Sequence, residues 1–306
     1  MSDNLIHCEN LSKRFGKLVV LDGMNFTLRE GETYGLLGVN GVGKSVFLET
    51  LWGMFPADSG TVSFFGEDPW RRPERVRARA GYFPEDPGYL PQMTVRETME
   101  MVRAFISFKW DAALADELMR RFELNPDQKV SVLSRGTLAK LTLLLAVAHR
   151  PEVLLLDEPS AGLDPLVRDT VLEAVLEATG SEESAAVITS HVVHDIERLA
   201  DRVGIIHQGR LELEETVEAI RTGWTLAVLP PETDVAPLAE KLSAFGSYDL
   251  PGGRALLTKS PLDEVGRALN AMSHTPLEVK GLNVEQWFVA VHRCWKTATA
   301  DLIESL

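Results

Sequence analysis

The segment of this sequence best suited to bind phosphate is a glycine-rich octapeptide, GVNGVGKS, at residues Gly38–Ser45. It follows an apolar run that predicts a strand, Tyr34–Leu37, and it leads into a predicted helix, Lys44–Trp52. Glycines let successive backbone N–H groups curl around phosphate oxygens, and the helix N-terminus adds a favourable dipole. Lys44 would then reach the terminal phosphates, and Ser45 would ligate Mg²⁺. The residues predicted to bind the phosphate-bearing ligand here are Gly38, Asn40, Gly41, Gly43, Lys44, Ser45 and Val46.

A second apolar run ends in two acidic residues, which suits a metal site beside bound phosphates. Val153–Leu156 predicts a buried strand, and Asp157 follows where that strand leaves the sheet. Carboxylate oxygens are preferred ligands of Mg²⁺, so Asp157 is expected to share the ion with Ser45. The next residue, Glu158, is expected to act as general base or to position the attacking water. An apolar run that ends in Asp-Glu is a weak signal alone, but the phosphate-binding loop makes it a strong one.

These residues need strands that end at one edge of a sheet, and the sequence predicts such a sheet. Short β-rich runs alternate with helical patterns from Leu5 to about Leu213, which is typical of an α/β domain with a mainly parallel sheet. Ala186–Thr189 and Val203–Ile206 predict two more buried strands, because both are apolar throughout. Apolar residues recur instead at helical spacing over about residues 87–150, which predicts a helical subdomain. Its helices are expected at about 95–106, 112–122 and 137–148.

The remainder of the chain, residues 216–306, has a different pattern from the predicted α/β domain of residues 1–215. Strands are expected at Trp224–Leu229, Arg254–Thr258 and Leu277–Lys280. Apolar stripes predict helices at about 235–245, 262–272 and 284–295. The pattern contains two strand–helix units and predicts a small α+β accessory domain.

Composition excludes several classes of protein. The chain has 306 residues and a net charge of −14, which argues against a protein that follows the phosphates of a nucleic acid. Cys8 and Cys294 are the two cysteines, and their spacing fits neither a disulfide framework nor a metal site, so a reducing cytosol is expected. The longest apolar runs, Leu141–Ala148 and Val153–Leu156, are far shorter than the roughly 20 residues that span a bilayer.

The order of these motifs resembles the ATP-binding subunit of an ABC transporter over roughly residues 5–213. The family's linker motif corresponds to Leu133–Thr137 (LSRGT), ahead of the strand that ends at Asp157. The resemblance implies a P-loop NTPase fold of the ABC type, with ATP and Mg²⁺ as cofactors and ATP hydrolysis as the activity. It also implies that Ser134 and Gly136 contact the γ-phosphate held by a second subunit. In isolation, Ser134 would equally be interpreted as a helix N-cap.

Three further segments match the family's order. Ser190-His191 resembles the switch histidine that senses the γ-phosphate, so His191 joins Lys44 and Glu158 as a residue expected to act in catalysis. Phe15 resembles the aromatic residue that stacks on adenine, and Ala161–Asp164 resembles the loop that contacts the partner subunit. A single histidine is more often structural, and an isolated phenylalanine more often belongs to a core.

The chain also departs from the family pattern. Arg135 replaces a glycine and Thr137 a glutamine of the linker motif, and Val46 replaces the common threonine after Ser45. Glu85 stands where the family usually has the glutamine of its Q-loop. Glu85 could still ligate Mg²⁺ through an oxygen, although it adds negative charge near the phosphates. We expect these changes to tune the rate of hydrolysis without abolishing it.

One phosphate-binding loop and one linker motif per chain imply a second ATPase subunit, in a homodimer or a close heterodimer. The resemblance further implies a separately encoded, polytopic membrane permease that docks near Glu85–Glu97, with Tyr89, Leu90 and Met93 offering apolar contact. The chain would then lie at the cytoplasmic face of the membrane. The tail resembles the accessory domain of exporter ATPases, which favours export; the sequence does not indicate the cargo.

Two alternatives to a transport ATPase predict different sequence features. A soluble ABC ATPase acting on ribosomes or nucleic acid predicts tandem ATPase domains, a long coiled-coil insertion or a basic face, and the sequence has none of these. A catalytically silent subunit would be expected to lack some of the residues that act on phosphate and water, but all of them are present. We therefore expect an active transport ATPase and no nucleic-acid partner.

Overall fold

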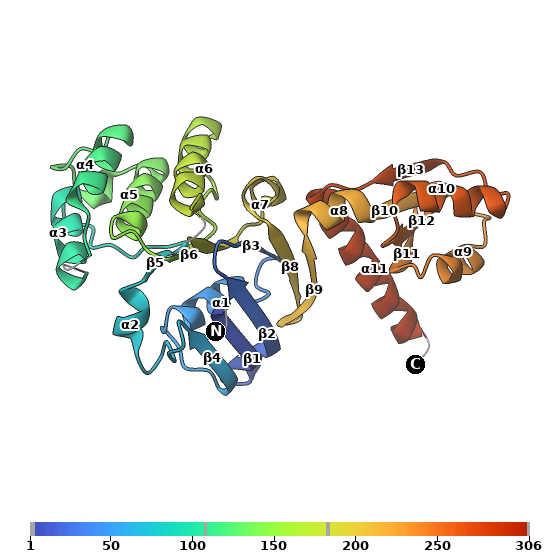
Figure 1. Cartoon of the computed structure of the whole chain (residues 1–306), viewed down its shortest axis with the longest axis horizontal. Helices are drawn as coiled ribbons and strands as arrows, with labels where there is room; N and C mark the ends of the chain where they lie inside the picture. The colour runs from blue at the N-terminus through green and yellow to red at the C-terminus, as the bar shows by residue number, and fades with distance from the viewer. Residues whose placement is uncertain (1–3, 107–108, 182–183, 305–306) are drawn as a thin grey trace. The chain divides into compact units, whose positions relative to one another are not determined.

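A computed structural model of the chain describes residues 4–106, 109–181 and 184–304. The chain forms two compact units, residues 1–214 and residues 215–306. Each unit has its own sheets and a hydrophobic core of its own. In Figure 1 the first unit runs from blue to yellow and the second from orange to red.

The first unit is built around a six-stranded sheet in the order β5-β6-β7-β3-β8-β9. β3 pairs in parallel with β7 and β8, and β6 pairs in parallel with β5 and β7. β3, β6 and β7 are buried along their whole length, as expected for strands covered on both faces. The parallel sheet predicted from the sequence is confirmed. The strands are β3 (Thr33–Leu37), β5 (Ala80–Phe83), β6 (Val153–Asp157), β7 (Ala185–Thr189), β8 (Arg202–His207) and β9 (Arg210–Thr216).

An antiparallel sheet completes this unit, with the order β2-β1-β4. Its strands are β1 (Asn4–Phe15), β2 (Leu18–Arg29) and β4 (Ser59–Phe64). Buried and more exposed side chains alternate over parts of β1 and β2, because one face of the sheet packs on the core. In that core the Phe26 ring packs edge-on against Tyr34 and Phe47, with centroids 4.9 Å and 5.0 Å away. The sequence analysis did not predict this second sheet, in which the short 15–18 turn forces β1 and β2 into an antiparallel pair.

The helices of the first unit begin at well-defined caps. The helical segment contains α3 (Val95–Phe105), α4 (Ala112–Arg121) and α5 (Arg135–Val147), so the three helices predicted there are confirmed. Thr94 forms a capping box with Glu97 before α3, and Asp111 caps α4. The other helices are α1 (Lys44–Leu51), α2 (Pro73–Arg77), α6 (Pro165–Thr179), α7 (Val193–Leu199) and the 3₁₀ turn η1 (Val130–Val132).

The second unit contains a four-stranded antiparallel sheet in the order β11-β12-β10-β13. Its elements are α8 (Val217–Gly223), β10 (Thr225–Leu229), α9 (Ala236–Lys241), β11 (Gly246–Leu250), β12 (Gly253–Thr258), α10 (Leu262–Ala271), β13 (Glu278–Gly281) and α11 (Val284–Glu304). From β10 to β13 the order is β-α-β-β-α-β, as in ferredoxin-like domains. The predicted strands and helices are present, but the sequence prediction missed β11 and α8. Both are short, and β11 (GSYDL) carries too few apolar residues to indicate a strand.

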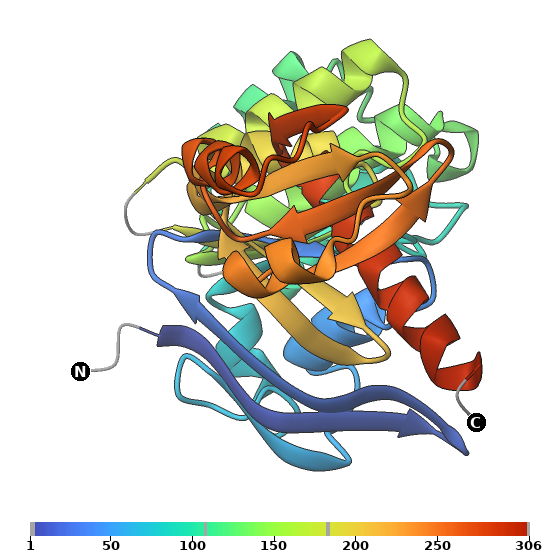
Figure 2. The same ribbon diagram turned by 90° about the vertical axis from the view of Figure 1, so that its right-hand side faces the viewer.

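Both faces of this second sheet are covered. α9 and α10 pack on one face, through a core that includes Leu238, Leu256 and Leu269. α11 packs on the strands β11 and β12 and on α8. The Trp224 and Trp287 rings meet edge-on there, with centroids 5.8 Å apart. Figure 2 shows α9 and α10 in front of the sheet and α11 passing behind it.

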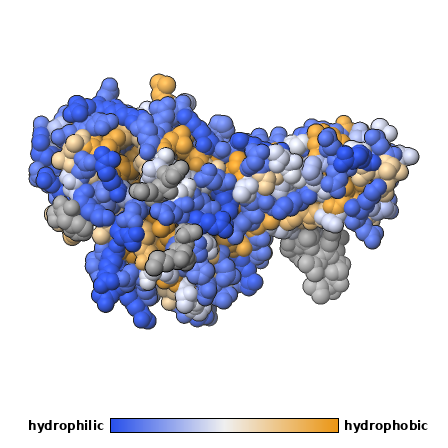
Figure 3. All heavy atoms as spheres, in the orientation of Figure 1, coloured by the Kyte–Doolittle hydropathy of each residue, from blue (hydrophilic) through white to orange (hydrophobic). Residues whose placement is uncertain are grey.

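Among the residues that the structure describes, no helix combines the length and the apolar character that crossing a bilayer requires. The face of the molecule in Figure 3 is mostly hydrophilic, with apolar patches among the helices α4 and α5. Buried apolar side chains of α5, such as Leu141, Leu143 and Leu144, account for the long apolar run in the sequence.

Candidate nucleotide site

The predicted phosphate-binding loop lies between β3 and α1, the strand and the helix that the sequence predicted on either side of it. Gly41 and Gly43 have φ angles of +78° and +113°, which L residues with a side chain rarely adopt. A Cβ atom at Gly43 would lie 2.9 Å from the backbone oxygen of Val20. The Lys44 ammonium folds back over the loop and donates a hydrogen bond to the Gly38 carbonyl at 2.9 Å. A loop so curled, ending at a helix N-terminus with a lysine above it, fits the phosphates of a nucleotide.

Asp157 lies at the end of β6 with a buried carboxylate, 2% exposed. The Thr189 hydroxyl donates to its Oδ1 at 2.6 Å, and the Ser45 hydroxyl also hydrogen-bonds to it. Burial raises the pKa of Asp157, while these two hydrogen bonds lower it in part. A hydroxyl and a carboxylate that already meet beside the phosphate loop are a donor set that Mg²⁺ accepts, with the remaining ligands from phosphate and water.

The Glu158 side chain is held between a lysine and a histidine. Its Oε2 accepts a hydrogen bond from the His191 backbone N–H at 3.0 Å and lies 2.6 Å from His191 Nδ1. Its Oε1 lies 3.8 Å from Lys44 Nζ. The Glu158 backbone has a φ of +51°, and its N–H donates to the Thr189 carbonyl at 3.2 Å. The structure thus brings together Lys44, Glu158 and His191, which the sequence suggested as catalytic groups.

The sequence analysis did not identify the residues that hold Asp157 and Glu158 in position. Thr189 hydrogen-bonds both to the Asp157 carboxylate and to the Glu158 backbone N–H, at 2.6 Å and 3.1 Å. Thr189 is the last residue of β7, directly before Ser190-His191, and a hydroxyl residue at a buried strand end was the available signal. Asp195, 2% exposed, accepts hydrogen bonds from Ser160 and Arg168. That cluster links the segment after Glu158 to α6 and α7, and no short-range pattern indicates it.

The linker motif begins α5. Ser134 is the N-cap of this helix: its hydroxyl accepts a hydrogen bond from the Thr137 N–H at 3.1 Å, and it lies 2.8 Å from the Thr137 hydroxyl. The N-cap interpretation of Ser134 is therefore confirmed, and the residue is exposed as well. A Cβ at Gly136 would lie 3.0 Å from the Val167 side chain, so this glycine allows α5 to pack closely on α6.

Phe15 and Glu85 lie at exposed positions. Phe15 ends β1 with 43% of the residue exposed, its ring edge-on to Phe55 with centroids 5.2 Å apart, and the Lys13 ammonium lies 5.4 Å from its centroid. Much of the ring is therefore open to a planar partner. Glu85 lies on the segment after β5 and is also exposed. Asn40 lies at an exposed position of the phosphate loop, whereas Val46 is partly buried against the core.

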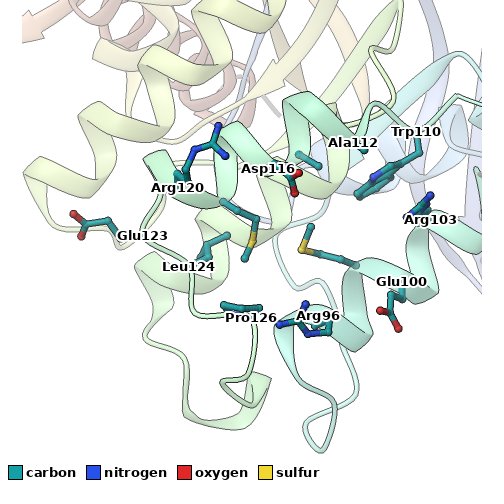
Figure 4. A pocket seen from close by; sticks show the side chains of 13 residues that line it. Arg96, Glu100, Arg103, Trp110, Ala112, Asp116, Arg120, Glu123, Leu124 and Pro126 are labelled. Carbon is teal, nitrogen blue, oxygen red and sulfur yellow. The ribbon is translucent and has the colours of Figure 1, made fainter.

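Two larger cavities lie in the helical part of the first unit, and the predicted nucleotide residues line neither. One, about 450 Å³, lies among β5, α2, α3 and α5, with Tyr82, Tyr89 and Phe105 in its wall. The other, about 520 Å³, lies between α3 and α4 (Figure 4). Its rim carries three arginines and three acidic residues, so it has no strong net charge to attract phosphate. They are Arg96, Glu100, Arg103, Asp116, Arg120 and Glu123.

Known proteins are similar to this chain in sequence. The family model described as ABC transporter matches residues 21–161. Nod factor export ATP-binding protein I of Burkholderia lata is 36% identical over 259 residues, which cover 82% of this chain and 84% of that protein. The ABC transporter ATP-binding protein YtrB of Bacillus subtilis is 32% identical, over 76% of this chain and 78% of that protein.

Solved structures share the fold. The structure of an ATP-binding subunit of an ABC transporter superposes with a TM-score of 0.65 and 27% identity, covering 71% of this chain and 92% of the other. A bacterial ABC transporter cassette solved as a dimer gives a TM-score of 0.61 at 22% identity, covering 69% and 98%, which supports the fold alone. By its sequence relatives and its fold, the chain belongs to the ABC transporter family and is an ATP-binding, ATP-hydrolysing subunit.

Proposed function

We propose that this chain works as one of two ATPase subunits that close around ATP and Mg²⁺ and drive a separately encoded membrane permease in export. The observation that carries the proposal is the Glu158 carboxylate, which contacts His191 and lies 3.8 Å from Lys44 beside the phosphate loop. The names of the relatives include an export ATPase, and one structural neighbour was solved as a dimer.

In the proposed mechanism each site residue has one role, toward the phosphates, the metal, the attacking water or the adenine. Lys44 would bind the β- and γ-phosphates, and Ser45 and Asp157 would hold Mg²⁺, with Glu85 as a further candidate ligand. The metal would neutralise charge that develops on the phosphate oxygens. Glu158 accepts a hydrogen bond or the proton of the attacking water, and His191 keeps the carboxylate oriented. Phe15 would stack on the adenine.

A second subunit would complete each site through its linker motif. The exposed Ser134 hydroxyl and the N–H groups at the start of α5, including that of Gly136, are suited to the γ-phosphate bound by the other chain. Charge-assisted hydrogen bonds contribute on the order of 1.5–3 kcal/mol each, so loss of the terminal phosphate would weaken the dimer. This is how hydrolysis would open it.

The Glu158→Gln variant tests the dimer. We expect turnover to fall by about 10²–10⁴-fold, because the general base is lost, while ATP binding persists. The variant should therefore elute as a dimer from a sizing column run with Mg·ATP and as a monomer without nucleotide. Adding Lys44→Ala to the same chain should remove the dimer. A Glu158→Gln protein that binds ATP yet remains monomeric would contradict the closing step.

The cavity of about 450 Å³ among β5, α2, α3 and α5 is the proposed dock for the permease. Its wall is largely apolar, and Phe105 at its edge is 82% exposed. Of the three residues suggested by the sequence, Tyr89 lines this cavity, whereas Leu90 and Met93 are not among its lining residues. A short amphipathic helix of the permease would fit such a wall. The chain would then reside at the cytoplasmic membrane face through this contact.

Membrane association tests the dock. The tagged full chain, expressed in its native cells, should sediment with membranes and co-purify with one polytopic membrane protein in fixed ratio. Phe105→Glu should reduce association by at least about tenfold, because a charge would be buried in the contact. Leu277→Glu, at a side chain 60% exposed in the second unit, is the matched control and should leave association unchanged. Equal behaviour of the two variants would exclude this surface.

A further inference from the structure

Two of the positions at which this chain departs from its family's motifs, Glu85 and Arg135, line one small cavity in the first unit. The cavity lies where the segment after β5, the start of α5 and the segment after β6 come together. Glu158 is also part of its wall. The two departures are therefore spatial neighbours, although 49 intervening residues separate them in the sequence. The complete lining is Phe83, Pro84, Glu85, Pro87, Arg135, Leu138, Ala139, Thr142, Glu158, Pro159, Ala161 and Leu163.

The Arg135 side chain folds back onto its own chain. A Cβ atom built on Gly162 would overlap Arg135 Nη1 and would lie 2.7 Å from its Cζ. The guanidinium thus lies against this glycine, which has a φ of +66°. Gly162 belongs to the loop Ala161–Asp164 that follows Glu158, so Arg135 contacts the loop that leads away from the proposed general base.

The charges of the cavity wall complement one another. Among its lining residues, all within the described chain, two are acidic, Glu85 and Glu158, and one is cationic, Arg135. Replacing a neutral glutamine by Glu85 adds one negative charge beside Glu158. Replacing a glycine by Arg135 adds one positive charge on the same wall. The pair therefore leaves the net charge of the cavity as it would be with glutamine and glycine.

We infer that Arg135 is a positioning residue that acts within its own subunit, and that its role depends on Glu85. The guanidinium holds the Ala161–Asp164 loop and offsets the charge of Glu85, which would otherwise repel Glu158 and the phosphates beside it. The competing geometry has Arg135 reaching across to the γ-phosphate bound by a second subunit. In that case the effect of Arg135 on the stability of the nucleotide-free protein would not depend on residue 85. The inference rests on the proposed role of Glu158, but its thermal test below needs no nucleotide.

A double-mutant cycle on the full-length protein tests this dependence, with ATP hydrolysis measured for Arg135→Ala, Glu85→Gln and the double variant. We expect Arg135→Ala to lower turnover roughly fivefold when residue 85 is glutamate, and less than twofold when it is glutamine. The difference should shrink as salt is raised to about 1 M, because a charge effect is screened. Arg135→Lys should stay within about twofold of the wild type.

A second readout does not depend on hydrolysis. In nucleotide-free protein, Arg135→Ala should lower Tm by about 1–3 °C when residue 85 is glutamate and by less in the Glu85→Gln background. Lys129→Ala, which removes an exposed cation six residues before Arg135, should show no dependence on residue 85 in either measurement. Equal losses of turnover in both backgrounds, or no loss in either, would overturn the inference. So would a Tm effect of Arg135→Ala that does not change when Glu85→Gln is added.

Discussion

The Asp157→Asn substitution separates two expected effects of this carboxylate. Burial of its charge destabilises the fold, and the carboxylate is proposed to bind Mg²⁺. The carboxylate is buried, and burial is the main cause that raises its pKa. Asn keeps an oxygen that can accept the Thr189 hydroxyl, and the Ser45 hydroxyl can rotate to accept from the new amide. We therefore expect Asp157→Asn to fold and to be at least as stable as the wild type without nucleotide at neutral pH.

The pH dependence of that comparison has a defined sign. Because the pKa of Asp157 is higher in the folded than in the unfolded chain, the folded state holds its proton more tightly. Below the unfolded pKa of about 3.9 the group is neutral in both states and does not destabilise the fold. As the pH rises through the window up to the folded pKa, the unfolded chain loses this proton while the folded chain still holds it, so stability falls until the buried group also ionises. The advantage of Asp157→Asn should therefore grow through this window and stay constant above it.

Binding should change in the opposite direction. A ligand at 100 times its Kd adds about 2.7 kcal/mol to stability, and 1 kcal/mol raises Tm by about 2–4 °C for a unit of this size. Wild-type protein with saturating Mg·ATP should thus gain about 5–11 °C over the nucleotide-free protein. With Mg·ATP, the Tm of Asp157→Asn should rise only as much as the Tm of the wild type rises with ATP and EDTA. Thermal unfolding followed by circular dichroism measures both effects.

Two outcomes would refute this reasoning. If Asp157→Asn showed the same Mg²⁺-dependent rise in Tm as the wild type, the carboxylate would not be a metal ligand. If nucleotide-free Asp157→Asn were several degrees less stable than the wild type at neutral pH, burial of this charge would not destabilise the fold. Glu158→Gln is the matched control, since it removes the neighbouring carboxylate and should retain the Mg²⁺-dependent rise.

Three further substitutions test two other residues of the site and the packing of β5. His191→Ala should lower turnover by about 10²-fold with little change in ATP affinity, because its ring orients the base and is proposed to make no essential binding contact; equal losses of rate and affinity would argue otherwise. Phe15→Ala should weaken ATP binding by about three- to tenfold in a fluorescence titration, and the affinity for inorganic triphosphate should stay unchanged. Gly81→Ala should lower the free energy of unfolding by about 1–3 kcal/mol, because the new Cβ would overlap the Ala146 carbonyl oxygen; an unchanged denaturation midpoint would show that the backbone yields.

The parallel strands and the residues at their ends could be predicted from sequence because the same physical constraint produces both. A strand buried on both faces must be apolar throughout. The first charged residue after the apolar run, Asp157, therefore marks the end of the strand. Lys44 and the glycines before it are likewise local, since curling a backbone around phosphate needs consecutive residues. In these cases the information lies within one short segment.

The bracing residues could not be found in the same way. Arg168 and Asp195 are 27 residues apart and meet only because α6 and α7 pack side by side. The proposed dependence of Arg135 on Glu85 could not be predicted from the sequence either, because the two residues come together only in the fold. In the sequence, each is a separate departure from a motif with no explanation. β11 was not predicted because its own side chains do not indicate a strand. It is stabilised instead by its pairing with β12.

One backbone segment, residues 157–160, connects the proposed nucleotide site to α6 and α7. Asp157 faces the proposed metal, Glu158 faces the proposed water, and Ser160 donates a hydrogen bond to Asp195 of α7, which also accepts one from Arg168 of α6. Glu158 has a positive φ; its backbone N–H donates to Thr189 of the neighbouring strand, and its carboxylate accepts from the His191 N–H in the loop after that strand. A shift of the carboxylate when the terminal phosphate leaves must therefore move that loop or strain this backbone. Either response would carry the loss of phosphate to α6 and α7, which are joined by the ion pair between Arg168 and the buried Asp195.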